Sequence, residues 1–261
     1  MDFDAKRSGS GTREWSEHSV NIQVGCSNGC LYCYAADAAA KLHGGWCERL
    51  DWTRERLSKA AAMTSYPKKE GVVMFPTTHD ITPFNLEAFI RVALLVLAKG
   101  NQLLIVSKPR LDCIRPLLEA LDLYKAQIMF RFTIGTMDEK LLRFWEPGAS
   151  SPSERVECLS LATHAGFRTS VSIEPIVGGE WDAICVVDAV GSMVTDSIWI
   201  GKMNKLAARV DVSDPVVAAA VQSVEDAQSD EAILRLYWLF QDVPYIHWKQ
   251  SIKDVVAASK Q

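Results

Sequence analysis

The chain has no long apolar run, and its charge is not strongly of one sign. No stretch of eighteen apolar residues occurs among its 261 residues, and residues 1–12 are polar and rich in Gly and Ser. A membrane-spanning helix and a secretion signal would both require longer apolar segments. We therefore expect a cytoplasmic protein without membrane contact, in which residues 1–14 form a flexible N-terminal segment.

The sequence also lacks the basic excess of proteins that bind nucleic acids over a large surface. The formal net charge is −4, and residues 171–261 hold seven Lys or Arg against thirteen Asp or Glu. Because phosphate backbones attract clustered cations, this composition does not by itself indicate a nucleic-acid-binding face. The first two thirds of the chain are nearly neutral and can still carry a local basic patch.

Cysteine is scarce. Seven cysteines are an odd number, too few and too unevenly spaced for a disulfide scaffold, which indicates a reducing compartment. Cys113, Cys158 and Cys185 each lie in an apolar or helix-like stretch, where a free cysteine usually behaves as a small buried hydrophobe. These three are not expected to carry chemistry.

Strand-like and helix-like segments alternate along the chain. Short β-branched or apolar runs predict strands at residues 20–24, 72–75, 103–106, 128–134, 169–173 and 197–200. Segments of helical period lie between them, at residues 57–63, 86–98, 114–121, 139–145 and 154–165. Repeated strand and helix predict a parallel sheet, and the length suits one α/β barrel.

The last part of the chain differs from this alternation. Residues 215–224 and 232–240 read as two helices, and the aromatic run at 243–248 as a closing strand or a cap. The fold class predicted is therefore α/β, a partial (β/α)6 TIM-like barrel of parallel strands with a C-terminal helical extension at about 205–261. No linker or repeat follows residue 12, so we expect one domain, residues 15–261, in a monomer.

Three cysteines, Cys26, Cys30 and Cys33, are packed into one short loop after the first predicted strand. No further cysteine or histidine follows within nine residues. Three thiolates on an iron–sulfur cluster that prefers four ligands leave one iron open to a small molecule. The alternative is a structural zinc site with His43 or Cys47 as the fourth ligand, although such sites normally use a second C-x2-C pair, which is absent.

In parallel barrels, chemistry gathers at the C-terminal ends of the strands because the loops there converge. The cysteine loop follows the first strand, so we expect it at this mouth. Polar residues at the other strand ends are then candidate ligands. They are Thr77, Thr78, His79, Asp80, Ser107, Lys108, Arg131, Thr133, Thr136, Glu174, Lys202 and Asn204.

Three residues are candidates for catalysis. His79 beside Asp80 predicts a proton relay, because histidine titrates near neutrality; the alternative is a polar loop before Pro83. Lys249, in the run His247-Trp248-Lys249, is expected to line the barrel mouth; the alternative is that this run closes the core with an aromatic pair.

The string GCSNGCLYCYA resembles the cluster loop of the radical S-adenosylmethionine (SAM) superfamily. Residues 132–177 further resemble the spore photoproduct lyase group, which tends to show T-x-D-E followed by E-P-x-A-x-S-x-E-E-R, then an A-G turn and a strand ending near P-I. The resemblance implies a [4Fe-4S] cluster on Cys26, Cys30 and Cys33, with SAM on the fourth iron. It also implies an electron donor such as flavodoxin or ferredoxin, and a 5′-deoxyadenosyl radical that abstracts hydrogen from a substrate.

The resemblance also implies ligands for the cofactor. Tyr32 would face the adenine, Thr77, Thr78 and Asp80 would hold the methionine amino group or the ribose, and Lys108 would pair with the methionine carboxylate. Thr133 matches a fourth-strand serine, and Glu174 would lie near the adenine. Ser107 and Arg131 are included as further cofactor-binding residues because of their strand-end positions.

The chain departs from the lyase pattern at the second strand end, where the lyases carry an extra cysteine. Residues 75–80 read FPTTHD, and Cys47 is the only nearby alternative. The lyase reaction is therefore not implied. Three hypotheses stay open: a radical enzyme acting on a nucleobase or nucleotide in a nucleic acid, a radical enzyme acting on a small molecule, peptide or modified nucleotide, and a metal-stabilised binding protein without catalysis.

Overall fold

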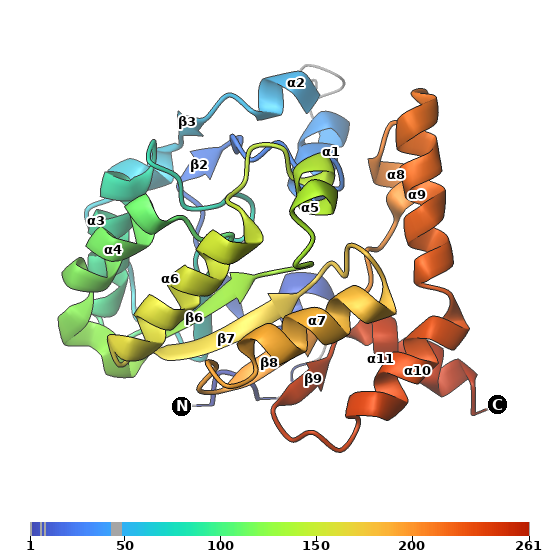
Figure 1. Cartoon of the computed structure of the whole chain (residues 1–261). Coiled ribbons are helices and arrows are strands. Elements are labelled where there is room, and N and C mark those ends of the chain that lie inside the picture. The colour runs from blue at the N-terminus through green and yellow to red at the C-terminus, as the bar shows by residue number, and fades with distance from the viewer. Residues whose placement is uncertain (1, 6, 8, 43–48, 261) are drawn as a thin grey trace.

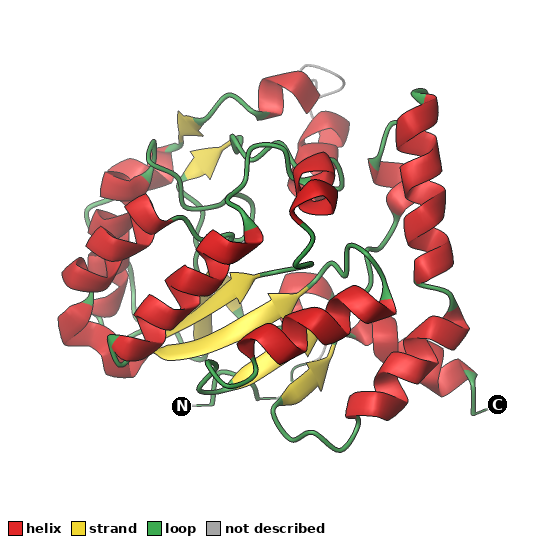
Figure 2. Cartoon of the chain, viewed as in Figure 1, coloured by secondary structure: helices red, strands yellow, loops and turns green. Residues whose placement is uncertain are grey.

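The protein is described by a computed structural model that covers residues 2–5, 7, 9–42 and 49–260. Within these residues, seven parallel strands form one curved sheet with helices along its outer face (Figures 1 and 2). The strands, in spatial order, are β1 (His18–Ser19), β4 (Val72–Met74), β5 (Gln102–Ser107), β6 (Ile128–Thr133), β7 (Arg168–Ile173), β8 (Ser197–Ile200) and β9 (Ile246–Trp248).

The strand order confirms the predicted partial barrel. Each neighbouring pair is parallel, and the described sheet stays open between β1 and β9. The aromatic run near the C-terminus supplies β9, so it is a closing strand rather than a cap. The helices that follow the strands of the sheet are α3 (Leu86–Leu97), α4 (Leu111–Ala120), α6 (Pro152–His164), α7 (Glu180–Val190) and α11 (Gln250–Ala258).

The remaining elements are short or lie at the ends of the barrel. They are η1 (Gly11–Glu14), β2 (Gln23–Val24), α1 (Tyr34–Leu42), α2 (Arg49–Trp52), β3 (Arg56–Leu57), η2 (Lys59–Ala62), η3 (Asp122–Gln127), α5 (Glu139–Trp145), α8 (Leu206–Arg209), α9 (Pro215–Ala227) and α10 (Asp230–Phe240). No helix in the described part of the chain is long and apolar enough to cross a membrane.

Strand alternation separates two cores. Outward-facing side chains such as Phe130 and Phe132 on β6 pack under α3, α4, α6 and α7, where Phe75 stacks on Phe89 with ring centroids 3.9 Å apart. Burying each such side chain stabilises the fold by about 1.5–3 kcal/mol. The inward-facing side chains form a smaller core inside the barrel. The sheet is therefore packed on both faces below the C-terminal ends of its strands.

The N-terminal segment packs into the open barrel, which differs from the flexible segment that its composition suggested. Phe3 is fully buried among the inward-facing residues, and Asp4 forms an ion pair with Arg131 of β6. Trp15 meets Trp199 of β8 edge to face at 6.0 Å. Aromatic burial and a charge pair outweigh the low hydrophobicity of this segment.

Two expectations about local structure are wrong. The run at residues 20–24 was expected to be the first strand of the sheet, but β1 comes just before it, and β2 pairs with β3 in a separate antiparallel sheet. The expected helix at 57–63 is the end of β3 followed by the single turn η2. A small two-stranded sheet therefore introduces the cysteine loop.

Candidate active site

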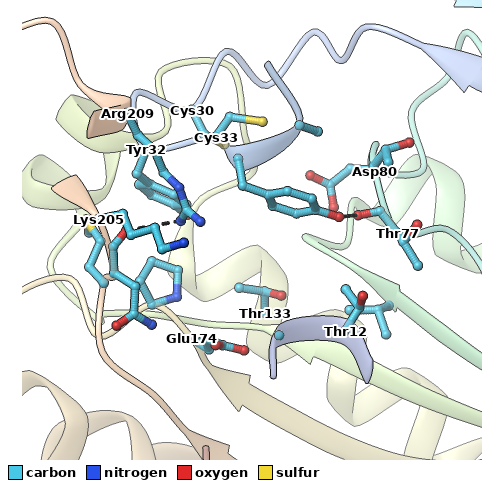
Figure 3. Close-up of a pocket in the computed structure, with 18 of the residues that line it drawn as sticks. Thr12, Cys30, Tyr32, Cys33, Thr77, Asp80, Thr133, Glu174, Lys205 and Arg209 are labelled. Atoms are coloured by element: carbon cyan, nitrogen blue, oxygen red, sulfur yellow. Dashed lines mark hydrogen bonds between the residues drawn. The ribbon is translucent and has the colours of Figure 1, made fainter. Parts of the chain in front are cut away.

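A cavity of about 650 Å³ lies at the C-terminal ends of the strands. Its volume falls within the range of about 300–1,000 Å³ that is typical of ligand pockets. Cys26, Cys30 and Cys33 all line it, together with side chains that follow β4, β5, β6, β7 and β8. Figure 3 shows Cys30 and Cys33 on one side of this space and Thr133, Glu174 and Thr12 on the opposite side.

The cysteine loop is held by backbone hydrogen bonds at both ends. The N–H of Cys26 donates to the carbonyl of Trp52 at 2.7 Å, and the N–H of Leu31 donates to the carbonyl of Trp145 at 2.9 Å. All three thiols are free. Burial raises the pKa of Cys26 to about 12 and the pKa of Cys30 well above its usual range, so both thiols are neutral until a cation binds them.

Asp80 connects the cysteine loop to the strand ends. Its Oδ1 accepts from the N–H of Lys108 at 2.7 Å and from the Ser107 hydroxyl at 3.1 Å. Its Oδ2 accepts from Asn28, inside the cysteine loop, at 2.8 Å, and lies 4.0 Å from Cys26 Sγ. Burial alone would raise the pKa of Asp80, but the positive charge of Lys108 and these hydrogen bonds lower it. Asp80 is therefore a carboxylate that positions the loop.

Lys108 is the cation of this half of the cavity. Its Nζ lies 3.5 Å from Asp80 and 5.9 Å from the centre of the Tyr32 ring. Burial alone would lower the pKa of Lys108, but Asp80 and Cys30 raise it well above its usual range. A cation is thus fixed beside the cysteines, where it can bind a carboxylate.

Tyr32 is tied to a buried ion pair. Its hydroxyl donates to Glu146, whose other oxygen accepts from Arg155 at 2.5 Å, and both charged side chains are fully buried. Arg155 also donates to the carbonyl of Thr133 at 3.1 Å. Burial, the charge of Glu146 and the hydrogen bond raise the pKa of Tyr32 well above its usual range. The EPGASSPSER stretch therefore supports the cysteine loop from behind.

Thr77 and Thr78 form the wall beside the small sheet. Their N–H groups donate to Asn21 Oδ1 at 2.8 and 3.0 Å, and the hydroxyl of Tyr34 donates to the Thr77 carbonyl. Both threonines line the cavity, as does Thr133 at the end of β6. The structure thus places these three threonines at the cavity, whereas Thr136, also expected there, is buried, donates to Asp182 and does not line it.

His79 lines the cavity, but its ring is committed to the protein. Nε2 accepts from the N–H of Ile22 at 3.3 Å, and Nδ1 lies 3.0 Å from the carbonyl of Asp80. Burial lowers its pKa below the usual value. Both ring nitrogens thus lie within hydrogen-bond distance of backbone groups and position the loop, and the part of His79 in a proton relay stays a prediction.

Lys249 lies under the cavity instead of lining it. Its Nζ donates to the carbonyl of Gly11 at 2.7 Å, lies 3.2 Å from both Glu14 and Glu174, and sits 3.9 Å from the centre of the Trp15 ring. These contacts hold the side chain, which is 1% exposed, below the cavity, and its catalytic role stays a prediction. Glu174 does line the cavity, and burial raises its pKa in spite of Lys249.

Two expected cofactor ligands also lie outside the cavity lining. Arg131 faces the barrel interior one layer below Thr133, where it pairs with Asp4 and donates to Ser170 at 3.0 Å. Ser107 donates to Asp80 and accepts from the N–H of Ile81 at 3.0 Å, so it supports a wall residue. Neither side chain lines the cavity, and a contact of either with the cofactor stays a prediction.

Other lining residues were not found from the sequence. Thr12, Glu14 and Trp15 arrive from the N-terminal segment, and Lys205 and Arg209 from the connection after β8. Lys205 and Arg209 could have been predicted only from their positions beyond a strand end. No local pattern marks the N-terminal residues as part of the cavity. His43 and Cys47, the alternative zinc ligands, lie outside the described residues.

The side chains at the cavity fit a cluster and an organic cofactor. No three His, Cys, Asp or Glu side chains in the described residues lie close enough together to hold one metal ion, whereas a [4Fe-4S] cluster binds each thiolate through a different iron. The buried Nε1 atoms of Trp15 and Trp52, two lining residues, have no hydrogen-bond partner in the described part of the chain. The cavity thus offers soft thiolates to iron.

An open parallel barrel that carries three free thiols at its C-terminal edge places soft ligands where an iron–sulfur cluster would bind. The family model of the Radical SAM superfamily matches residues 20–186, and the chain belongs to this superfamily. The superfamily takes its name from radical chemistry on SAM.

Known proteins share parts of this arrangement. Uncharacterized protein ORF301 of Acidianus two-tailed virus is 26% identical over 168 residues, which cover 60% of this chain and 55% of the viral protein. The chain therefore matches only about half the length of that relative.

Solved structures of spore photoproduct lyase share the fold. A mutant with dinucleoside spore photoproduct has a TM-score of 0.60 at 15% identity, with 94% of this chain and 79% of that chain covered. A second mutant, with bound AdoMet and dinucleoside spore photoproduct, has a TM-score of 0.58 at 15% identity, with 89% of this chain and 76% of that chain covered. At this identity the likeness is one of fold.

Proposed function

We propose that this chain is a radical SAM enzyme that acts on a nucleobase or a modified nucleotide. The observation that carries the radical chemistry is that Cys26, Cys30 and Cys33 line one cavity with free thiols. When bound there, the cluster and SAM supply a radical that removes one hydrogen atom from the substrate. An external one-electron donor such as flavodoxin or ferredoxin would supply the electron, and the chain would work as a monomer.

The chain's own residues would bind and orient the cofactor. Lys108 is the cation beside the cysteines and would bind the methionine carboxylate. Its partner Asp80 also accepts from Asn28, the Ser107 hydroxyl and the Lys108 N–H, so Asp80 does not depend on the Lys108 amine alone. Thr77 and Thr78 offer hydroxyl groups from the wall beside the small sheet, and Thr133 offers one from the side opposite the cysteines. Tyr32 would place its ring, fixed by Glu146, at the side of the cofactor. Side chains fixed in this way would hold the substrate close to the radical.

The substrate class is supported by the fold. The neighbours of TM-score 0.60 and 0.58 hold a dinucleoside photoproduct, and they cover most of this chain. The cavity here combines aromatic side chains, which can stack on a base, with hydroxyl and charged groups. A small molecule or peptide substrate is the alternative that the experiment below must exclude.

The test of the radical chemistry is reductive cleavage of SAM. Wild-type protein, reconstituted with iron and sulfide under anaerobic conditions and given SAM and dithionite, should release 5′-deoxyadenosine. Cys30→Ala should release none, because one thiolate of the cluster is gone. The matched control is Cys185→Ala on α7, which removes a free thiol that does not line the cavity and should leave the activity unchanged.

The test of the substrate uses the same assay with candidate substrates. Deoxynucleotides or DNA labelled with deuterium should transfer deuterium to 5′-deoxyadenosine, whereas labelled amino acids or peptides should not. A colourless zinc protein that releases no 5′-deoxyadenosine, with Cys30→Ala behaving as wild type, would instead identify a metal-stabilised binding protein.

A further inference from the structure

Two cations line the cavity on the wall opposite Asp80. Lys205 precedes α8 and Arg209 ends it, four residues later, and both line the cavity. Figure 3 shows them across the cavity from Thr77 and Asp80. The two cations therefore lie on the opposite side of the cavity from Asp80, the partner of Lys108.

Most of the other charged groups around the cavity have an oppositely charged partner. Asp80 pairs with Lys108, Glu14 and Glu174 share Lys249, and Lys202 lies 3.7 Å from Asp230. Asp254 forms no ion pair with a described residue and accepts from Gln250 at 2.7 Å. Neither Lys205 nor Arg209 forms an ion pair with any residue that the structure describes. A positive charge is thus left over at one place on the cavity wall.

The guanidinium of Arg209 has donors to spare. Its Nη1 donates to the carbonyl of Asn204 at 3.1 Å, which leaves the other N–H groups of the fork available. Burial and the neighbouring Cys33 raise the pKa of Tyr34 to about 12, and the positive charge of Arg209 opposes this rise. Since Tyr34 also lines the cavity, the field of Arg209 reaches into it.

Lys205 is held in an unusual backbone conformation. Its φ of 59° is left-handed, and it is the only non-glycine residue with positive φ in the described part of the chain. Such a conformation is unfavourable for a lysine and persists only where neighbouring structure holds it. Here the N–H of Met203 donates to Gln228 at 2.7 Å, and Leu206 is buried. The backbone is thereby fixed so that the side chain of Lys205 extends into the cavity (Figure 3).

We infer that Lys205 and Arg209 bind an anionic group of the substrate, a phosphate in the nucleotide reading. Lysine and arginine are the usual donors to phosphate and carboxylate oxygens, and arginine can bind two of these oxygens at once. The single carboxylate of SAM has its own cation in Lys108. The identification of the anion as phosphate rests on the proposed function, whereas the anion site itself rests on the two uncompensated cations.

The experiment measures binding to the reconstituted protein with SAM present. Thymidine 5′-monophosphate and thymidine are the probes, titrated by calorimetry. Wild type should bind the monophosphate at least tenfold more tightly than the nucleoside. Lys205→Asn, which tolerates the left-handed backbone, and Arg209→Gln should each weaken the monophosphate about tenfold or more and leave thymidine and SAM binding unchanged. Lys140→Gln, an exposed cation of α5, is the matched control.

The outcomes separate this inference from the nucleotide proposal. Equal binding of monophosphate and nucleoside by wild type overturns the anion site while leaving a nucleoside substrate in place. Loss of SAM affinity in Lys205→Asn and Arg209→Gln, without loss for the monophosphate, assigns the two cations to the cofactor and also overturns it. If neither thymidine compound binds, but pyrophosphate or succinate binds and needs both cations, the anion site stands and the nucleotide proposal fails.

Discussion

At the scale of single residues, the cavity depends on charges that are buried and matched. Asp80 holds Asn28 of the cysteine loop, the hydroxyl of Ser107 and both the N–H and Nζ of Lys108. Glu146 does the same behind the loop, between Tyr32 and Arg155. Removing one partner of such a pair leaves the other charge buried and alone, which costs more than the pair contributes.

The first prediction concerns Asp80→Asn. The change removes the counter-charge of Lys108, whose side chain is 13% exposed, so the free energy of unfolding should fall by about 3 kcal/mol. Urea unfolding measures this, and iron bound after reconstitution should fall with it because the cysteine loop loses its anchor. Glu157→Gln breaks an ion pair with Arg115 in which both side chains are more than half exposed, and it should cost under about 1 kcal/mol. Equal losses in both variants would refute the role of Asp80.

The second prediction concerns Glu146→Gln. Arg155 is fully buried, and without its partner it should reduce the free energy of unfolding by about 3–5 kcal/mol. The matched control is Glu139→Gln on α5, whose pair with Arg143 is exposed and contributes about 0.3–0.5 kcal/mol. Chemical denaturation of the two variants side by side gives the comparison. A Glu146→Gln protein as stable as Glu139→Gln would show that the pair does not support the loop.

At the scale of elements, the sequence predicts the bounds of the strands well, but it predicts poorly how far each side chain on a strand lies from the cavity. Hydrophobic periodicity located β5, β6, β7 and β8 within about two residues. It also placed Arg131 and Thr133 on the same face of β6, which is correct. Two residues along a strand span about 7 Å, however, so Thr133 reaches the cavity and Arg131 only the ion pair below it. Periodicity therefore predicts which face of the sheet a side chain lies on, but not how far along the strand it lies from the cavity.

Contacts between distant elements account for the rest of what was missed. Thr77, Asp80, Lys108 and Glu174 were found because parallel strands end at one edge. Trp15 reaches the same cavity only because the N-terminal segment folds back into the barrel, and no local pattern marks that path. The helix α7 was not predicted because apolar residues occur on its exposed face as well as its buried face. Trp181 is 71% exposed, while Ala183, Val186, Val187 and Val190 are buried.

The third prediction tests the contact between the α5–α6 connection and the cysteine loop. A Cβ at Gly148 would overlap the carbonyl oxygen of Ser27 and lie 3.1 Å from the Cα of Asn28. Gly148→Ala should therefore displace the loop and reduce the iron bound after reconstitution severalfold. Gly100→Ala is the control: its φ of +75° strains an alanine by about 1 kcal/mol, but the nearest atom is the Lys68 amine at 3.5 Å. Iron loading measured beside urea unfolding separates a displaced loop from general strain.

At the scale of the whole molecule, the N-terminal segment and the barrel form one unit. Arg131 lies between Trp15 and Trp199, with its guanidinium 4.9 and 5.2 Å from their ring centres. Asp4 pairs with Arg131 and accepts from Trp199 at 2.9 Å. Lys249 joins the same segment to Glu174 through Gly11 and Glu14. The far side of the cavity is therefore built on contacts between the two ends of the chain.

The pH dependence of stability should report on these contacts between the N-terminal segment and the barrel. Burial alone would raise the pKa of Asp4, but the charge of Arg131 and the hydrogen bond from Trp199 lower it below its ordinary value of 3.8. A carboxyl whose pKa is lower in the folded state stabilises the fold above the unfolded pKa, and this contribution is lost as the pH falls through the folded pKa. Wild type should therefore lose stability as the pH falls below about 4.

Asp4→Asn should remove this dependence at its source. At pH 7 the variant leaves Arg131 buried without a counter-charge, so its free energy of unfolding should be about 3 kcal/mol lower than that of wild type. The difference should shrink toward pH 3, because the wild-type carboxyl is then becoming neutral as well. Asp122→Asn, which breaks an exposed pair with Lys125, should stay within about 0.5 kcal/mol of wild type throughout. Urea unfolding from pH 3 to pH 7 compares the three proteins. A constant gap between wild type and Asp4→Asn across this range would mean that the variant acts by changed packing, and that the charge of Asp4 does not hold the N-terminal segment in the barrel.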